Sequence, residues 1–110
     1  MSVLVVAECG VNHQGDVGQA FLLANAAKEA GADICKYQHF RADDLQPERY
    51  ALLKPLELSD AEMVNIAWHC KAIGIEFCCT PFGVREVEFL APLVKRMKVA
   101  SGCIARQDLL

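Results

Sequence analysis

The chain has 110 residues, of which 54% are hydrophobic, and this length and composition suit one globular domain with a buried core. A formal net charge of -3 gives no electrostatic reason to expect nucleic acid or an anionic membrane as a partner. The first apolar run, residues 3–7, is interrupted by Glu8 and has no basic leader. We therefore expect no signal peptide, no membrane span and a cytoplasmic location.

Short apolar runs alternate with longer amphipathic stretches along the chain. Residues 3–7 predict a first strand of the continuous β-branched kind that is buried on both faces in a parallel sheet. Asp16 is expected to cap a helix that reaches Ala30, after which Gly31 supplies a left-handed stop. Residues 33–38 predict the second strand, and a polar connection follows it.

The second half of the chain repeats this order. Residues 59–62 (SDAE) match the capping box of a helix that reaches Ile73 and is closed by Gly74. Residues 75–79 predict a third strand, and the turn that follows leads into a shorter helix ending near Pro92. Residues 96–100 predict a fourth strand.

This alternation predicts an α/β fold with a parallel sheet and right-handed crossovers. A complete (β/α)8 TIM-type barrel needs about 250 residues, so about four parallel strands and three helices correspond to its N-terminal half. The alternative is a small open sheet of the flavodoxin type, which would need a glycine-rich phosphate loop after the first strand. Residues 10–15 (GVNHQG) are only loosely similar to such a loop.

The six cysteines do not indicate a disulfide framework. Cys35, Cys78 and Cys79 lie in strand-like apolar runs and Cys70 lies on a helical pattern, so we interpret them as reduced, buried thiols. The chain has no CxxC or HxxxC spacing of the kind that indicates structural zinc.

Polar side chains stand where the predicted strands end. Ligands gather at the carboxyl ends of parallel strands, because the loops and helix N-termini converge there. The residues at these positions are Glu8, Lys36, Gln38, Thr80, Lys98 and Ser101. A carboxylate, two ammonium groups and two hydroxyls along one edge predict a site for a small anion with a group for proton transfer.

Each of these residues also has a structural interpretation. Glu8 and Lys36 could form an ion pair inside a barrel, and Thr80 and Ser101 could cap the helices that follow them. Asn12 and His13, after the first strand, are further candidates for ligand contact; otherwise they would serve a left-handed turn and a solvated loop.

Several other polar and aromatic residues are predicted to have no functional role. His69 is interpreted as a surface or packing histidine, and Trp68 and Phe89 as core or interface packing on helical faces. Arg85, Glu86 and Glu88 are predicted to form a solvated helix face.

Six short segments resemble the N-acetylneuraminate (sialic acid) synthase family in order and spacing. They are residues 7–15 (AECGVNHQG), 30–33 (AGAD), 36–38 (KYQ), 56–59 (LELS), 80–82 (TPF) and 98–102 (KVASG). The resemblance covers essentially the whole chain. It implies the N-terminal half of a β/α barrel, with no second domain within residues 1–110.

The resemblance also implies a reaction. Enzymes of this family condense phosphoenolpyruvate with an N-acylated sugar aldehyde such as N-acetylmannosamine and release phosphate, and a divalent manganese or magnesium ion polarises the aldehyde. By position, Glu8 corresponds to the proton-handling carboxylate. The positions that correspond to the phosphoenolpyruvate cradle are Lys36, Thr80, Lys98 and Ser101. The resemblance does not decide between N-acetylneuraminate and related nine-carbon products, such as legionaminic and pseudaminic acid.

Three features depart from the family pattern. Cys103 stands where the family usually has an acidic metal ligand, and a thiolate suits softer metals than manganese or magnesium. His39 stands where a threonine is common, and the loop of residues 41–50 is shorter than usual. The family's two metal-binding histidines, the rest of the barrel and the sugar-binding C-terminal domain are expected beyond Leu110.

A half barrel of this kind would expose apolar strand edges, so we expect a homo-oligomer. Two rival functions remain. The chain could be a non-catalytic module that binds a small anion or a full-length synthase, or an unrelated thiol or metal protein that uses Cys9 and Cys103.

Overall fold

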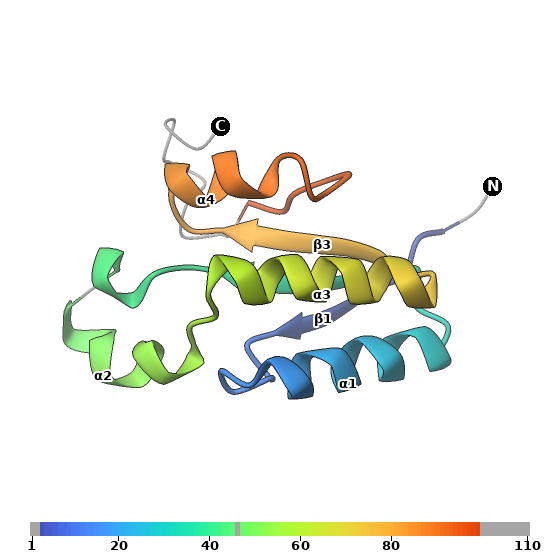
Figure 1. Ribbon diagram of the computed structural model, residues 1–110, viewed down its shortest axis with the longest axis horizontal. Coiled ribbons are helices and arrows are strands. Elements are labelled where there is room, and N and C mark those ends of the chain that lie inside the picture. Colours follow the sequence, from blue (N-terminus) through green and yellow to red (C-terminus); the bar gives the residue numbers. More distant parts are fainter. Residues whose placement is uncertain (1–2, 46, 100–110) are drawn as a thin grey trace.

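The computed structural model describes residues 3–45 and 47–99. Within these ranges three parallel strands lie side by side in the order β1 (Val6–Gly10), β2 (Ile34–His39) and β3 (Glu76–Pro81) (Figure 1). Where the sequence predicts a fourth strand, Met97 forms an isolated parallel bridge to Cys79. The last residue of that predicted strand lies outside the described residues.

Two long helices connect the strands and end where the sequence predicts. Helix α1 (Val17–Glu29) is capped by Asp16, whose carboxylate accepts hydrogen bonds from two backbone N–H groups. Helix α3 (Asp60–Ile73) begins with the complete capping box and is closed by Gly74 in the left-handed conformation. A shorter helix, α4 (Val84–Leu90), follows β3 and ends before the predicted Pro92.

The connection between β2 and α3 is built from single turns. It contains the short helix α2 (Tyr50–Leu53) and 3-10 turns at Ala42–Asp44, Pro47–Arg49 and Lys54–Leu56. In Figure 1 it projects from the end of the sheet at which the strand arrows point. The loop after β1 packs closely on it, because a Cβ atom on Gly15 would lie 1.9 Å from the carbonyl oxygen of Pro55.

The hydrophobic core lies between the sheet and the helices. Strand alternation directs Cys9, Cys35, Tyr37, Phe77 and Cys79 into this layer. They meet small residues of α1 and larger ones of α3 and α4, namely Ala20, Ala24, Ala27, Met63, Ile66, Cys70 and Leu90. We call the opposite side of the sheet, which carries Glu8, Lys36, Gln38 and Thr80, the site face.

The structure differs from the sequence prediction at the first strand. β1 begins at Val6 rather than Val3, and the predicted two-sided burial is wrong, since the four residues Val3 to Val6 are 49–80% exposed. β1 has β2 as its neighbour on one side, and its other edge carries no strand among the described residues. A buried β-branched run and an apolar edge strand have the same sequence pattern, so the pattern alone does not separate them.

One of the two alternatives predicted for Trp68, core packing, is excluded, and one burial prediction on α4 is wrong. Trp68 is 63% exposed, so its role in an interface stays a prediction, and Lys71 lies over its ring at 5.3 Å from the centroid. Glu86, which is predicted to be solvated, is 1% exposed because it pairs with Arg85 beneath the N-terminus of α4.

The described residues confirm an α/β fold with parallel strands, and no helix among them is long and apolar enough to cross a membrane.

Candidate functional site

The carboxyl ends of the strands bring three predicted site residues together. Parallel register places Glu8 of β1 opposite Lys36 of β2 and places Gln38 opposite Thr80 of β3. The Lys36 ammonium group forms an ion pair with the Glu8 carboxylate and lies 3.4 Å from the Thr80 hydroxyl. An ammonium, a carboxylate and a hydroxyl from three different strands therefore meet on the site face.

A bulge in β1 brings Gln38 close to the same group. The pairing register shifts between Glu8 and Gly10, and Gly10 takes a positive φ of 53°. A Cβ atom on Gly10 would lie 3.1 Å from Glu8 Oε1 and 3.9 Å from Gln38 Nε2. The glycine thus allows the carboxylate and the amide to approach the same point.

Exposure distinguishes this group from an ion pair that is sealed in a core. Lys36 and Thr80 are almost fully buried, but the side chain of Glu8 is 56% exposed. A ligand that arrives from the solvent can therefore reach the Glu8–Lys36 pair. The buried ammonium has little water to stabilise it and depends on the Glu8 carboxylate instead, so an anionic ligand over Lys36 shares this charge with Glu8.

The loop after β1 does not bring its two candidate residues into this group. Asn12 is exposed, and its backbone N–H donates to the carbonyl of Cys9. His13 is fully buried beside Tyr37, whose side chain points into the core layer. The Nδ1 atom of His13 accepts from the Gly15 N–H, and burial lowers its pKa below the usual value. His13 therefore shapes the loop.

Within the described residues, the fourth predicted strand adds no side chain to the Glu8–Lys36–Thr80 group. Lys98 is exposed, and its backbone N–H donates to Cys79. Ser101 and Cys103 lie outside the described residues.

Residues 3–45 and 47–99 contain no cluster of three or more histidine, cysteine, aspartate or glutamate side chains that fits a metal ion. The described residues therefore do not by themselves fit the manganese or magnesium site that the family resemblance implies.

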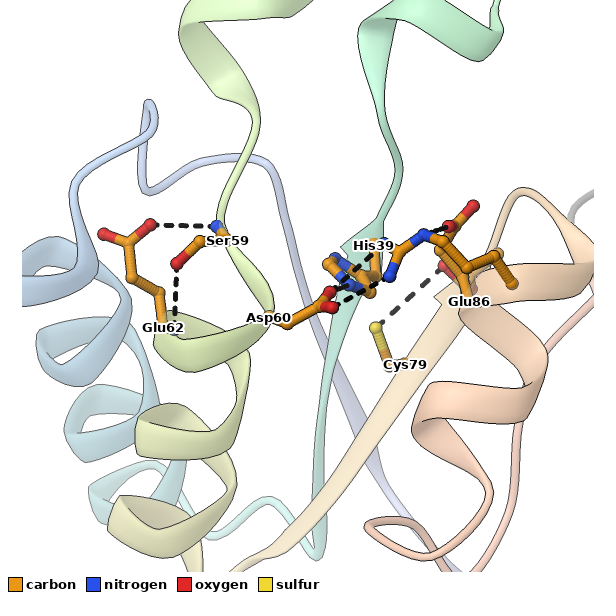
Figure 2. A network of polar contacts seen from close by, with 8 residues as sticks. His39, Ser59, Asp60, Glu62, Cys79 and Glu86 are labelled. Carbon is orange, nitrogen blue, oxygen red and sulfur yellow. Dashed lines mark hydrogen bonds and ion pairs between the residues drawn. The ribbon is translucent and has the colours of Figure 1, made fainter.

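The sequence analysis missed a polar network beside the site, which is drawn in Figure 2. His39 is 1% exposed and its Nε2 lies 2.8 Å from Asp60 Oδ1, at the first residue of α3. The guanidinium group of Arg85 donates two further bonds to the same carboxylate, at 2.8 and 3.1 Å. Burial lowers the pKa of His39, whereas the bonds from Arg85 lower that of Asp60. The unusual histidine after residues 36–38 was the signal that could have indicated this network.

The described thiols are buried and free, as predicted. Cys35 Sγ and Cys70 Sγ lie 3.2 Å apart, and the hydrogen bond between them raises the pKa of Cys35 to about 12. The Cys9 pKa is also raised, chiefly by its hydrogen bond with Cys35, and burial raises that of Cys79. These thiols carry almost no thiolate at neutral pH and are poor nucleophiles or metal ligands, which counts against the thiol-protein interpretation of Cys9.

A parallel sheet that gathers charged side chains at its carboxyl ends defines a protein of the α/β class, in which such ends hold the ligand in barrels and open sheets alike. Comparison with known proteins gives the family. A model described as the NeuB family matches residues 23–110. The chain belongs to the NeuB family.

Relatives agree with this assignment. The chain is 40% identical to N,N'-diacetyllegionaminic acid synthase of Legionella pneumophila, across 93% of the chain and 34% of the relative. It is 32% identical to human N-acetylneuraminate-9-phosphate synthase, across 89% of the chain and 32% of the relative. The chain thus spans about a third of the length of the curated relatives it matches.

A solved structure supports the same family assignment. The N-acetylneuraminic acid synthetase of Leptospira borgpetersenii, crystallised with citrate, superposes with a TM-score of 0.88 at 30% identity. The match covers 94% of this chain and 38% of that protein. The likeness to this synthetase confirms the barrel-type fold class over the open flavodoxin-type sheet.

Proposed function

We propose that this chain supplies the phosphoenolpyruvate-binding part of a NeuB-type synthase. The reaction joins phosphoenolpyruvate to an N-acylated sugar aldehyde such as N-acetylmannosamine and releases phosphate, in the cytoplasm. Family membership supports the proposal, since the relatives are named as synthases of legionaminic acid and of N-acetylneuraminate 9-phosphate.

One observation carries the proposal: the Lys36 ammonium group is held at the strand tips by a half-exposed carboxylate and a buried hydroxyl. Phosphoenolpyruvate carries a carboxylate and a phosphate, and both bind ammonium and hydroxyl donors well. Lys36, Thr80 and the Gln38 amide supply such donors from rigid strands, which hold a ligand in one orientation. Lys98 and Ser101 would extend the cradle, as the family resemblance implies.

Glu8 is assigned the proton-handling role. Its carboxylate is the exposed member of the group, so it can reach the reacting carbons of a ligand bound over Lys36. Asn12 would contact the sugar from the exposed loop after β1. The divalent ion remains part of the proposal only through the family, because the described residues hold no site for it.

The proposal is tested by titrating the chain with phosphoenolpyruvate in a calorimeter. Lys36→Gln should weaken binding about tenfold or more, since it removes a charge-assisted bond worth roughly 1.5–3 kcal/mol. Lys28→Gln is the matched control, because Lys28 is an exposed lysine whose ammonium group donates to the Gly74 carbonyl at 3.1 Å. Circular dichroism of both variants checks that the fold is kept.

A second measurement separates the two functional classes. Phosphate release is followed after adding N-acetylmannosamine and manganese to the phosphoenolpyruvate complex. Release that depends on Glu8 supports the synthase, whereas binding without release supports the non-catalytic anion-binding module. Absence of phosphoenolpyruvate binding by the unmodified chain, or equal binding by Lys36→Gln, would overturn the proposed site.

A further inference from the structure

We infer that His39 is a positioning residue for this site. Through Asp60, it fixes the carboxyl end of β2, and with it Lys36 and Gln38, against the N-termini of α3 and α4. The inference rests on the proposed function only for the identity of the ligand.

The first step is the geometry of the anchor. Asp60 accepts from His39 Nε2 at 2.8 Å and from both terminal nitrogens of Arg85. Arg85 Nε lies 2.8 Å from the buried carboxylate of Glu86, and Figure 2 shows His39, Asp60 and Glu86 close together. One carboxylate therefore ties a strand end to the first turns of two helices. A bidentate guanidinium–carboxylate pair is also more rigid than a single contact.

The second step concerns the orientation of the ring. A carboxylate only accepts hydrogen bonds, so His39 Nε2 carries the proton and Nδ1 is left as an acceptor. Nδ1 is buried and has no hydrogen-bond partner among the described residues. The single bond to Asp60 thus determines the placement of the imidazole, and the Phe89 ring packs beside it at 5.4 Å.

The third step links the anchor to the site. His39 is the last residue of β2 and is buried beside Phe89 on the helix side of the sheet, whereas its neighbour Gln38 is on the site face. The carbonyl of His39 also accepts from the Phe82 N–H, just beyond β3. Fixing His39 therefore fixes the register in which Gln38 lies opposite Thr80.

The fourth step explains why this strand end needs an anchor. β2 is followed by a long connection, which reaches Ser59 and contains only single turns of helix. Segments with little regular structure open more readily than strands do, because fewer backbone hydrogen bonds oppose the motion. The His39–Asp60 bond, together with the buried Phe40 and Ala42, lies at the boundary between the strand and this connection.

The test compares His39→Leu, which removes the bond, with His39→Gln, whose amide nitrogen can replace Nε2 as the donor. His69→Leu is the matched control: His69 Nε2 also bonds an Oδ1 atom, that of Asn25 at 2.7 Å, but it links α1 to α3 away from the strand tips. The side-chain NMR signals of Lys36 and Gln38 are recorded for each variant, and phosphoenolpyruvate and inorganic phosphate are then titrated in.

We expect His39→Leu to shift the Lys36 and Gln38 signals and to weaken phosphoenolpyruvate binding at least fivefold. His39→Gln should restore most of both effects, and His69→Leu should change neither. If His39→Leu does not fold, Asp60→Asn takes its place, because an amide oxygen cannot serve His39 and both Arg85 nitrogens as the carboxylate does.

The outcomes separate the two proposals. Unchanged Lys36 and Gln38 signals in His39→Leu would overturn the positioning role, whatever binds. Shifted signals in a chain that binds neither phosphoenolpyruvate nor phosphate would keep the positioning role and overturn the proposed function. Equal effects of His39→Leu and His69→Leu would reduce His39 to a general contributor to stability, which also overturns the inference.

Discussion

Gly15 allows the loop after β1 to pack closely on the connection between β2 and α3. A Cβ atom on Gly15 would lie 1.9 Å from the Pro55 carbonyl oxygen, and the residue has a positive φ of 79°. Gly15→Ala should therefore lower the free energy of unfolding by about 3 kcal/mol, from backbone strain and from displacement of the Lys54–Leu56 turn. Urea unfolding followed by circular dichroism measures this change.

Gly31→Ala is the control for the backbone contribution alone. Gly31 has a positive φ of 91°, but nothing lies within 4 Å of the position that a Cβ atom would take there. This variant should lose only about 1 kcal/mol. Equal losses at the two positions would show that the contact with Pro55 contributes nothing.

At the residue scale, the sequence predicted those contacts that follow from strand ends alone. Glu8, Lys36 and Thr80 meet because parallel strands end at one edge, and this rule needs no knowledge of packing. Glu86 was predicted wrongly, because its burial depends on Arg85 and on the distant Asp60. A solvated helix face and a buried ion pair contain the same types of residue, so the sequence alone does not distinguish them.

At the scale of elements, the start of α3 can be tested directly. Ser59 Oγ accepts from the Glu62 N–H, and Glu62 Oε1 accepts from the Ser59 N–H. Ser59→Ala should lower the free energy of unfolding by about 1 kcal/mol, because an N-terminal amide loses its partner. Thermal unfolding by calorimetry gives the value.

Glu62→Gln keeps an acceptor oxygen and should cost only a few tenths of a kcal/mol. A loss as large as that of Ser59→Ala would mean that the charge at the helix N-terminus, rather than the reciprocal bonding, stabilises this end.

Elements with strong local signals were predicted well. Both long helices begin after their predicted capping residues; α3 ends at Gly74, and Gly31 follows the last residue of the cap of α1, each glycine with a positive φ, because caps act within one turn of chain. The bounds of β1 and the turns between β2 and α3 were not predicted. Strand bounds depend on the neighbouring strand, and the connection is held by side-chain bonds such as Glu57 Oε1 to the Ala42 N–H.

For the molecule as a whole, stability should depend on pH through two buried histidines. Burial lowers the pKa of both His13 and His39 in the folded chain. The unfolded chain therefore binds more protons once the pH falls below about 6.5, so the free energy of unfolding should decrease between pH 7.5 and 5.5. Urea midpoints at these two values measure the change, and His39→Gln should reduce it. A midpoint independent of pH would contradict both shifts.

We also propose self-association through the edge of β1 that carries no strand among the described residues. Val6 at the start of β1 and the three residues just before it, Val3, Leu4 and Val5, are 49–80% exposed, and paired or covered edges are the usual solution for such a strand. Sedimentation should detect dimers that dissociate on dilution. Leu4→Lys should abolish them, whereas Leu22→Lys, at an exposed position on α1, should not. A monomer at every concentration would exclude this contact.

The alternation of side chains along β2 also limits how the gene for this protein can evolve. Cys35 and Tyr37 supply the core layer and His39 is buried on the same side, while Lys36 and Gln38 supply the site face. Loss or gain of one codon within the strand would exchange these two sets and disrupt packing and ligand chemistry at once. Natural variation in length should therefore accumulate in the connection between β2 and α3, and β2 itself should change only by substitution.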